Sequence, residues 1–166
     1  QTGIFPRLPE PIPENLTETM KFVKEQNADL AIVVDPDVDR LVLITDKGEP
    51  FIEENTITLS AKHVLSKTKG NVVVNLSTTR AIDDVASAEG CKVFRSPVGE
   101  ANVVKLMKEV NAVIGGEGSG GVIYPALHYG RDALVGIAFT LQFLADSGKR
   151  LSEIKDELPN YFIAKK

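Results

Sequence analysis

The segment Asp35-Pro36-Asp37-Val38-Asp39-Arg40 places three carboxylates on alternate residues between two apolar runs. Residues 30–34 precede the segment, and residues 41–44 follow it. Apolar, β-branched runs of this length are typical of buried strands. We therefore expect the acidic segment to lie at the end of a strand, where open α/β sheets place their ligand sites.

Three like charges this close together repel one another unless a cation compensates them. Carboxylate oxygens are hard ligands that suit Mg²⁺, which completes its shell with waters or phosphate oxygens. We expect Asp35, Asp37 and Asp39 to hold Mg²⁺, with Arg40 beside them as a fixed cation suited to phosphate or carboxylate. The alternative is a solvated acidic turn. The Ca²⁺ pattern of EF-hands does not fit, because its Gly and its distal Glu are missing.

Composition indicates an ordinary soluble globular protein. The chain has 166 residues, of which 43% are hydrophobic and 25% are charged, enough for one domain or two small ones. A net charge of −4 gives no reason to expect nucleic acid or an anionic membrane as a partner. No apolar run approaches the roughly 20 residues of a membrane span. The single cysteine, Cys91, fits a cytoplasmic protein and excludes an internal disulfide.

Helical and strand patterns alternate along the chain, which favours an α/β fold. The periodicity predicts helices over 16–27, 55–67, 80–89, 100–110, 132–146 and 151–158. It predicts strands over 30–34, 41–45, 72–76, 91–95, 112–115, 121–124 and 161–164, with a hairpin turn at 46–49. This pattern predicts a three-layer α/β/α domain with a mixed sheet, preceded by a partial second α/β domain.

A second informative segment, Gly115-Gly116-Glu117-Gly118-Ser119-Gly120-Gly121, follows the apolar residues 112–114. Its glycines let a ligand approach the main chain closely. Glu117 and Ser119 lie two residues apart, so in an extended loop both would point to one side, where they suit paired sugar hydroxyls. The segment is not a phosphate-binding P-loop, because no Lys-Ser/Thr follows its last glycine. A glycine-rich turn without a ligand is the alternative.

Together the two segments resemble the α-D-phosphohexomutase family of phosphomannomutases and phosphoglucomutases. That family carries a metal loop of the form DGDxDR and, some eighty residues later, a sugar-binding loop of the form GExSGH. Further similarity lies in Gly3-Ile4-Phe5-Pro6 near the start and in Gly130-Arg131-Asp132 before the long helix. The resemblance covers nearly the whole chain.

The resemblance implies roles for individual residues. Asp35, Asp37 and Asp39 would hold Mg²⁺, and Arg40 would act beside a phosphoserine and the reacting phosphate. Glu117 and Ser119 would contact sugar hydroxyls. Two positions depart from the family, since Gly121 stands where a His is common and Ser77 stands near a usual basic residue. Arg80 either replaces that basic residue or is a solvated residue at a helix start, and Glu100 is a further candidate for substrate contact.

Enzymes of this family have four domains, and the resemblance divides the chain among three of them. Residues 1–52 would be the C-terminal part of domain 2, residues 53–160 domain 3, and residues 161–166 the start of the connection to domain 4. The catalytic serine and the phosphate-anchoring loop would belong to domains 1 and 4, which are missing. The whole protein would interconvert hexose 1-phosphate and hexose 6-phosphate, and this chain alone is expected to be inactive.

Two other functions remain open from the sequence. One is a non-catalytic module that binds a sugar phosphate or a metal. The other is a phosphatase of the haloacid dehalogenase type, suggested by a DxD pattern after a strand. The phosphatase pattern fits this segment poorly, because it has Thr or Val two residues beyond the second carboxylate, where this chain has Asp39. The choice among glucose, mannose and glucosamine phosphates is left open as well.

Overall fold

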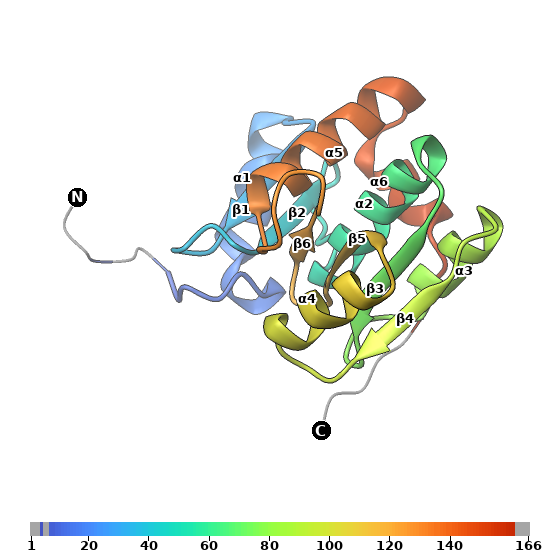
Figure 1. Cartoon of the computed structure of the whole chain (residues 1–166). Coiled ribbons are helices and arrows are strands. Elements are labelled where there is room, and N and C mark those ends of the chain that lie inside the picture. The colour runs from blue at the N-terminus through green and yellow to red at the C-terminus, as the bar shows by residue number, and fades with distance from the viewer. Residues whose placement is uncertain (1–3, 5–6, 162–166) are drawn as a thin grey trace.

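The centre of the structure, a computed structural model that describes residue 4 and residues 7–161, is a four-stranded mixed sheet (Figure 1). Its strand order is β4-β3-β5-β6, and a separate hairpin joins β1 to β2. The strands are β1 (Leu30–Val34), β2 (Leu41–Thr45), β3 (Asn71–Asn75), β4 (Val93–Ser96), β5 (Ala112–Glu117) and β6 (Gly121–Ile123). The helices are η1 (Pro13–Asn15), α1 (Thr17–Gln26), α2 (Glu53–Lys67), α3 (Ala81–Ala88), α4 (Glu100–Glu109), α5 (Ala133–Ser147) and α6 (Leu151–Glu157).

The direction of pairing makes the central sheet mixed. β3 pairs in parallel with both β4 and β5, whereas β5 and β6 are antiparallel neighbours joined by a short turn. The carboxyl ends of β3, β4 and β5 therefore meet at one edge, where α/β sheets place ligands. That edge carries Asn75, Ser96 and Glu117, which are the last residues of the three strands.

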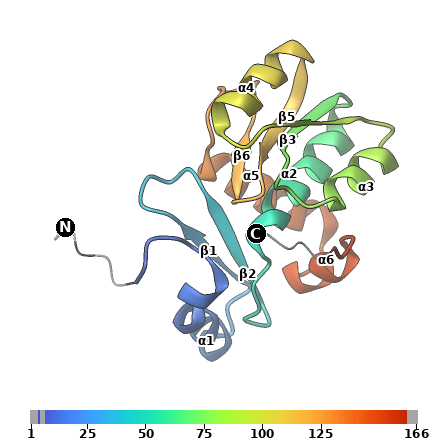
Figure 2. The ribbon, with the colours of Figure 1, turned by 90° about the horizontal axis from the view of Figure 1, so that it is seen from below.

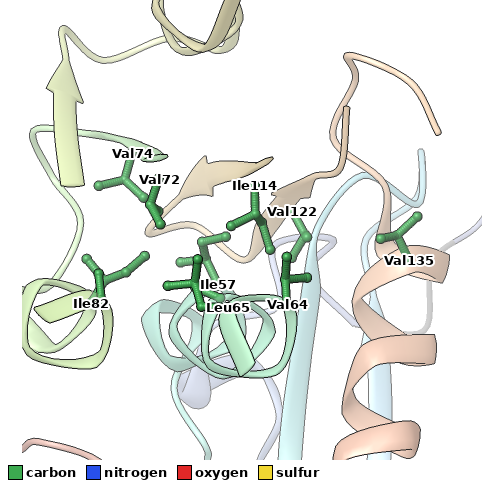
Figure 3. Close-up of a cluster of buried hydrophobic side chains, with 11 residues drawn as sticks. Ile57, Val64, Leu65, Val72, Val74, Ile82, Ile114, Val122 and Val135 are labelled. Atoms are coloured by element: carbon green, nitrogen blue, oxygen red, sulfur yellow. The ribbon is translucent and has the colours of Figure 1, made fainter. Parts of the chain in front are cut away.

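Helices cover both faces of this sheet. Successive side chains of a strand point to opposite faces, so Val72 and Val74 of β3 enter one apolar cluster and Val73 enters another. The first cluster, seen in Figure 3, contains side chains from α2, α3 and α5. The second contains Val103 and Met107 of α4. The result is a three-layer α/β/α arrangement, which confirms the fold class expected from the sequence.

The hairpin of β1 and β2 packs with α1 as a smaller unit beside the central sheet (Figure 2). Every residue of β2 is buried. Val42 and Ile44 join a cluster with Leu16 and Val23 around α1. The alternate residues Leu41 and Leu43 join a different cluster, whose other buried members, apart from Phe51, come from the central domain. β2 therefore lies between two apolar layers, as its unbroken apolar sequence predicted.

Two predicted strands have an end displaced by two residues, for identifiable reasons. Cys91 was expected to begin a strand, but its N–H donates to the carbonyl oxygen of Ala86 at 2.8 Å and completes the end of α3. β4 therefore starts only at Val93. β5 was expected to stop at residue 115, but its pairing of Glu117 with Gly121 of β6 carries it to Glu117. The strand expected over 161–164 falls mostly on residues 162–166, outside the described residues.

None of the helices within the described part of the chain combines the length and the apolar character that crossing a membrane requires.

Candidate functional site

The acidic segment forms the turn that joins β1 to β2. Asp35 is buried, and its Oδ1 accepts hydrogen bonds from the backbone N–H groups of Asp39 and Arg40 at 3.2 and 3.1 Å. Val38 has φ 60°, a left-handed conformation that is unfavourable for a β-branched residue. Its carbonyl oxygen accepts a hydrogen bond from the N–H of Ala133 at 3.2 Å. The turn is thus tied to the first residue of α5.

Asp35, Asp37 and Asp39 are arranged so that they could hold a metal ion. One carboxylate oxygen from each lies within 4.8 Å of the other two. Asp39 Oδ1 is buried and finds no hydrogen-bond donor among the residues that the structure describes. Its nearest cation is Arg40 Nε, at 3.7 Å. A buried carboxylate oxygen without a hydrogen bond is costly, and a divalent cation bound there would remove that cost. The donor set, with oxygen ligands alone, fits Mg²⁺.

The pKa values of this turn show how closely the carboxylates crowd. Burial opposes the charged form of Asp35, but the hydrogen bonds from Arg40 and Asp39 outweigh it, and the pKa of Asp35 lies below its ordinary value. Burial and a hydrogen bond shared with Asp35 raise the pKa of Asp39, against the attraction of Arg131. Asp35 therefore takes its negative charge more readily than Asp39, and a bound cation would favour the charged form of both.

Arg40 lies beside this turn and is half-buried. Its Nε is 3.5 Å from Asp35 Oδ2, and its Nη1 is 3.7 Å from Glu10 Oε1. Arg40 and Ser119 both line a small cavity of about 110 Å³. A cation and a hydroxyl around one cavity, next to a candidate Mg²⁺ site, can receive a phosphate oxygen.

Glu117 occupies the end of β5 and is only 4% exposed. Its Oε1 accepts hydrogen bonds from Asn75 Nδ2 at 2.9 Å and from the N–H of Gly99 at 3.2 Å. The sequence predicted Glu117 in an extended, glycine-rich loop together with Ser119. That placement was wrong, because the pairing of Glu117 with Gly121 makes Glu117 part of the strand. Glu117 is therefore held rigidly, whereas Ser119 lies in the turn between β5 and β6.

The turn between β5 and β6 packs closely against the start of β2. Gly120 has φ 97°, and a Cβ added to it would lie 2.5 Å from the carbonyl oxygen of Leu41. The carbonyl oxygen of Gly120 accepts a hydrogen bond from the N–H of Leu41 at 3.0 Å. Only glycine suits this position. Because Leu41 directly follows Arg40, this contact brings the glycine-rich turn against the acidic segment.

Arg131, just before α5, connects the acidic segment to the end of the sheet. Its Nη2 forms an ion pair with Asp39 Oδ2, and its Nη1 donates to Glu117 Oε2 at 2.6 Å. Its Nε lies 3.4 Å from Glu100 Oε2 at the start of α4. Burial alone would lower the pKa of Arg131, but the charges of Asp39, Glu117 and Glu100 raise it further above its usual value. Arg131 is therefore a permanent cation among three carboxylates.

The loop that presents Arg131 is fixed by its neighbours. His128 Nδ1 accepts a hydrogen bond from the N–H of Gly130 at 3.1 Å, and His128 Nε2 lies 2.9 Å from Asp132 Oδ2. Asp132 Oδ1 in turn accepts from the N–H groups of Leu134 and Val135, which caps α5. These contacts give His128 a structural role in the loop.

The predicted site residues do not all come together. Asp35, Asp39, Arg40, Glu117 and Glu100 belong to one network of ion pairs around Arg40 and Arg131. Asp37 lies beside Asp35 and Asp39, and Ser119 lines the same cavity as Arg40. Arg80 is separate, because it is exposed and its ion pair, at 3.8 Å, is with Asp83 of its own helix. A larger cavity, of about 360 Å³, lies between Ile52, Thr79 and Tyr161. We place the site at the carboxylate network because that cavity contains none of the predicted residues.

Two residues of the network, Arg131 and Asn75, were not among the predicted site residues. The sequence pointed to Gly130-Arg131-Asp132 only through its similarity to a family. Nothing in the spacing of these residues indicated that Arg131 contacts Asp39. Asn75 carried a weak signal, since a polar residue at the carboxyl end of a buried strand lies where ligands bind.

Comparison with known proteins links both halves of the chain to one family. The model described as phosphoglucomutase/phosphomannomutase, alpha/beta/alpha domain III, matches residues 53–162. The model for alpha/beta/alpha domain II of the same family matches residues 1–48. Two independent models thus match in the order in which the two segments of interest occur.

Individual relatives agree with this result. A phosphoglucomutase/phosphomannomutase of Thermococcus kodakarensis is 41% identical over 162 residues, covering 96% of this chain and 36% of that protein. A phosphoglucosamine mutase of Methanococcus maripaludis is 30% identical over 161 residues, covering 94% and 36%. The crystal structure of a phosphoglucomutase/phosphomannomutase family protein from Burkholderia thailandensis matches with a TM-score of 0.82 at 28% identity, covering 92% and 34%. The chain spans about a third of the length of these relatives.

Proposed function

Because this chain belongs to the phosphoglucomutase/phosphomannomutase family, we propose that it supplies the metal-holding and sugar-recognising parts of a phosphohexomutase. The whole protein interconverts a hexose 1-phosphate and a hexose 6-phosphate through a bisphosphorylated intermediate, in the cytoplasm. Residues 1–52 belong to domain 2 of this enzyme and residues 53–160 to domain 3. The phosphoserine and the remaining substrate contacts come from domains 1 and 4.

One observation carries this proposal: the acidic turn and Glu117 form a single network. Segments about eighty residues apart in sequence meet through Arg131, which pairs with Asp39 on one side and with Glu117 on the other. A phosphohexomutase needs these two functions together, because the metal must lie near the phosphoryl group while other groups hold the sugar. An isolated acidic turn would not require such a connection.

The roles of the residues follow from their positions. Asp35, Asp37 and Asp39 hold Mg²⁺, which when bound neutralises negative charge on phosphoryl oxygens. Arg40, half-buried beside the turn, orients the phosphate with its fixed positive charge. Ser119 offers a hydroxyl at the same cavity. Glu117 is held by three donors, but among the described residues Oε2 accepts one hydrogen bond, from Arg131, and a carboxylate oxygen can accept two.

Mg²⁺ binding to the 166-residue chain tests the metal part of the proposal. We expect affinity on the order of millimolar, as for other weak carboxylate sites for hard cations, and loss of binding in Asp37→Asn. Asp37 is exposed, so the substitution removes a ligand charge without disturbing the core. Asp29→Asn, which changes another exposed aspartate outside the cluster, is the matched control. Binding that survives Asp37→Asn unchanged would move the metal site elsewhere.

Activity of the whole protein tests the reaction. We expect conversion of glucose 1-phosphate, mannose 1-phosphate or glucosamine 1-phosphate to the corresponding 6-phosphate, and no conversion by the 166-residue chain alone. Hydrolysis of a generic aryl phosphate would favour a phosphatase instead. Binding of a hexose phosphate by the whole protein without turnover would favour a non-catalytic module.

A further inference from the structure

The guanidinium of Arg131 lies between carboxylates from three separate elements. Asp39 belongs to the turn between β1 and β2, Glu117 ends β5, and Glu100 begins α4. Each nitrogen of the guanidinium faces a different carboxylate, and the Arg131 side chain is only 18% exposed. A planar fork of this kind fixes the direction of each partner, which a lysine ammonium cannot do.

The two carboxylate oxygens of Asp39 have different surroundings. Oδ2 pairs with Arg131, whereas Oδ1 is buried without a hydrogen-bond donor among the described residues. Apart from an ion pair with Arg40 Nε at 3.7 Å, Oδ1 is therefore the oxygen of Asp39 that is available for a cation held together with Asp35 and Asp37. Groups that orient a ligating carboxylate from outside the metal shell strongly influence how well the metal binds.

Arg131 is itself fixed along its length. Its backbone N–H donates to Glu100 Oε1 at 3.1 Å. Its aliphatic carbons lie over Gly121, where an added Cβ would be 2.9 Å from Arg131 Cγ. Gly121, the position that departs from the family pattern, therefore leaves the room that the Arg131 side chain uses. With its backbone and its aliphatic carbons fixed in this way, Arg131 contacts Asp39 and Glu117 at the same time.

We propose that Arg131 is a positioning residue that couples the metal site to the sugar-binding site. It orients Asp39 for the cation and Glu117 for the sugar with one rigid group, so that a change at either carboxylate is transmitted to the other. This inference rests on the proposed function, because it requires Mg²⁺ at the acidic turn. It concerns a residue outside both the metal ligands and the sugar-binding pair.

Arg131→Met tests the proposal by the direction of its effect on Mg²⁺ affinity. Methionine keeps an unbranched side chain over Gly121 but carries no charge. If Arg131 acted only as a nearby positive charge, its removal would strengthen the binding of a cation. If Arg131 positions Asp39, the affinity of the 166-residue chain for Mg²⁺ falls by about tenfold, as is typical when a group outside the metal shell is lost.

Coupling is measured by NMR during the same Mg²⁺ titration. In the wild-type chain, we expect Mg²⁺ to shift the amide resonances of residues 116–121 as well as those of residues 35–40. In Arg131→Met, the shifts should be confined to residues 35–40. Arg95→Met is the control, because Arg95 is comparably buried but its carboxylate partner is Asp83, and it reaches Asn75 of the network only through a long hydrogen bond to the backbone carbonyl. We expect it to retain both the affinity and the shifts at both segments.

Arg131→Lys keeps the positive charge but loses the planar guanidinium. It is the second test variant if Arg131→Met does not fold. It should also bind Mg²⁺ more weakly than the wild type and lose the shifts at residues 116–121. Suppose that the folded variants bind Mg²⁺ as tightly as the wild type or more tightly, and that the amide shifts at residues 116–121 are retained. This result would overturn the inference about Arg131 but not the proposed function. A wild-type chain whose Mg²⁺ binding is absent, or is insensitive to Asp37→Asn, would overturn the metal part of the proposed function and this inference with it.

Discussion

Glu117 and Ser119 lie two residues apart, yet their surroundings differ. Glu117 is buried and accepts hydrogen bonds from Asn75, Gly99 and Arg131. Ser119 lies in the turn and lines a cavity with Arg40. A substitution at Glu117 therefore changes the internal network as well as any contact with a sugar, whereas a substitution at Ser119 changes only the cavity wall.

In the whole protein, Glu117→Gln and Ser119→Ala should both reduce kcat/KM with hexose 1-phosphates. Loss of a charged hydrogen-bond partner costs about 1.5–3 kcal/mol, which corresponds to roughly tenfold to a hundredfold in kcat/KM. We expect Glu117→Gln to have the larger effect, because charge-assisted hydrogen bonds are the stronger ones. Steady-state kinetics with glucose, mannose and glucosamine 1-phosphates provide the measurement.

Thermal melts of the same variants separate binding from folding. Ser119→Ala should melt like the wild type, whereas Glu117→Gln should melt at a lower temperature, because Arg131 loses a buried counter-charge. If both variants keep wild-type kcat/KM on every hexose phosphate tried, Glu117 and Ser119 do not contact the substrate.

Sequence reasoning at this scale succeeded where the residues are close in sequence. The spacing of Asp35, Asp37 and Asp39 predicted a cluster of carboxylates because a tight turn brings alternate residues together. It did not reveal Arg131, whose partners come from three segments that meet only after the chain has folded. The burial of Glu117 was likewise invisible, because it depends on the pairing of β5 with β6.

At the scale of elements, the N-terminus of α5 links the fold to the site. Asp132 Oδ1 accepts hydrogen bonds from the N–H groups of Leu134 and Val135 at 2.7 and 3.2 Å. The other oxygen of Asp132 holds His128, which in turn holds Gly130 next to Arg131. The cap of this helix therefore also orders the loop that presents the central cation of the network.

Asp132→Ala should lower the free energy of unfolding by about 1 kcal/mol, the usual cost of losing an N-cap side chain. Urea unfolding of the 166-residue chain at pH 7 measures this loss. Asp29→Ala, which removes an exposed aspartate between α1 and β1, should leave the free energy of unfolding nearly unchanged. An Asp132→Ala chain as stable as the wild type would show that α5 starts equally well without its cap.

Most helices and strands were predictable because their patterns are local. The apolar runs of β1, β2 and β3 and the periodicity of α2 and α5 each indicate one kind of element. Strand ends were less predictable, because they depend on pairing and on neighbouring caps. The displaced start of β4, caused by the hydrogen bond from Cys91 to Ala86, shows this directly.

At the scale of the whole molecule, the hairpin of residues 30–45 shares a core with the larger domain. Leu41, Leu43 and Phe51 pack in one apolar cluster with residues of α2, α5 and α6. This shared core holds the acidic turn at a fixed place relative to Glu117. The sequence indicated two units but not this contact, because the apolar run of β2 does not identify which helices cover it.

A polar contact joins the same two parts of the chain. Asp46, in the turn after β2, accepts hydrogen bonds from the backbone N–H and the hydroxyl of Ser152 in α6, both at 3.0 Å. Burial opposes the charge of Asp46, but the two hydrogen bonds from Ser152 outweigh it, so the pKa of Asp46 lies below its usual value. The charged form of Asp46 therefore stabilises the folded state.

Asp46→Asn should accordingly lower the free energy of unfolding at pH 7, by about 1 kcal/mol for the loss of a charged acceptor. Because the pKa of Asp46 is lower in the folded than in the unfolded state, this contribution is complete above the unfolded value of about 3.9. It disappears as the pH falls through the lower folded value, since Asp46 is then protonated in both states. Urea unfolding of the wild-type and Asp46→Asn chains from pH 7 downward should show a difference in the free energy of unfolding, a gap that closes below about pH 4.

Asp156→Asn, which changes an exposed aspartate of helix α6, is the control and should show little difference from the wild type at pH 7. A gap that stays constant to the lowest pH, or that is absent at pH 7, would show that the charge of Asp46 does not hold the two parts together.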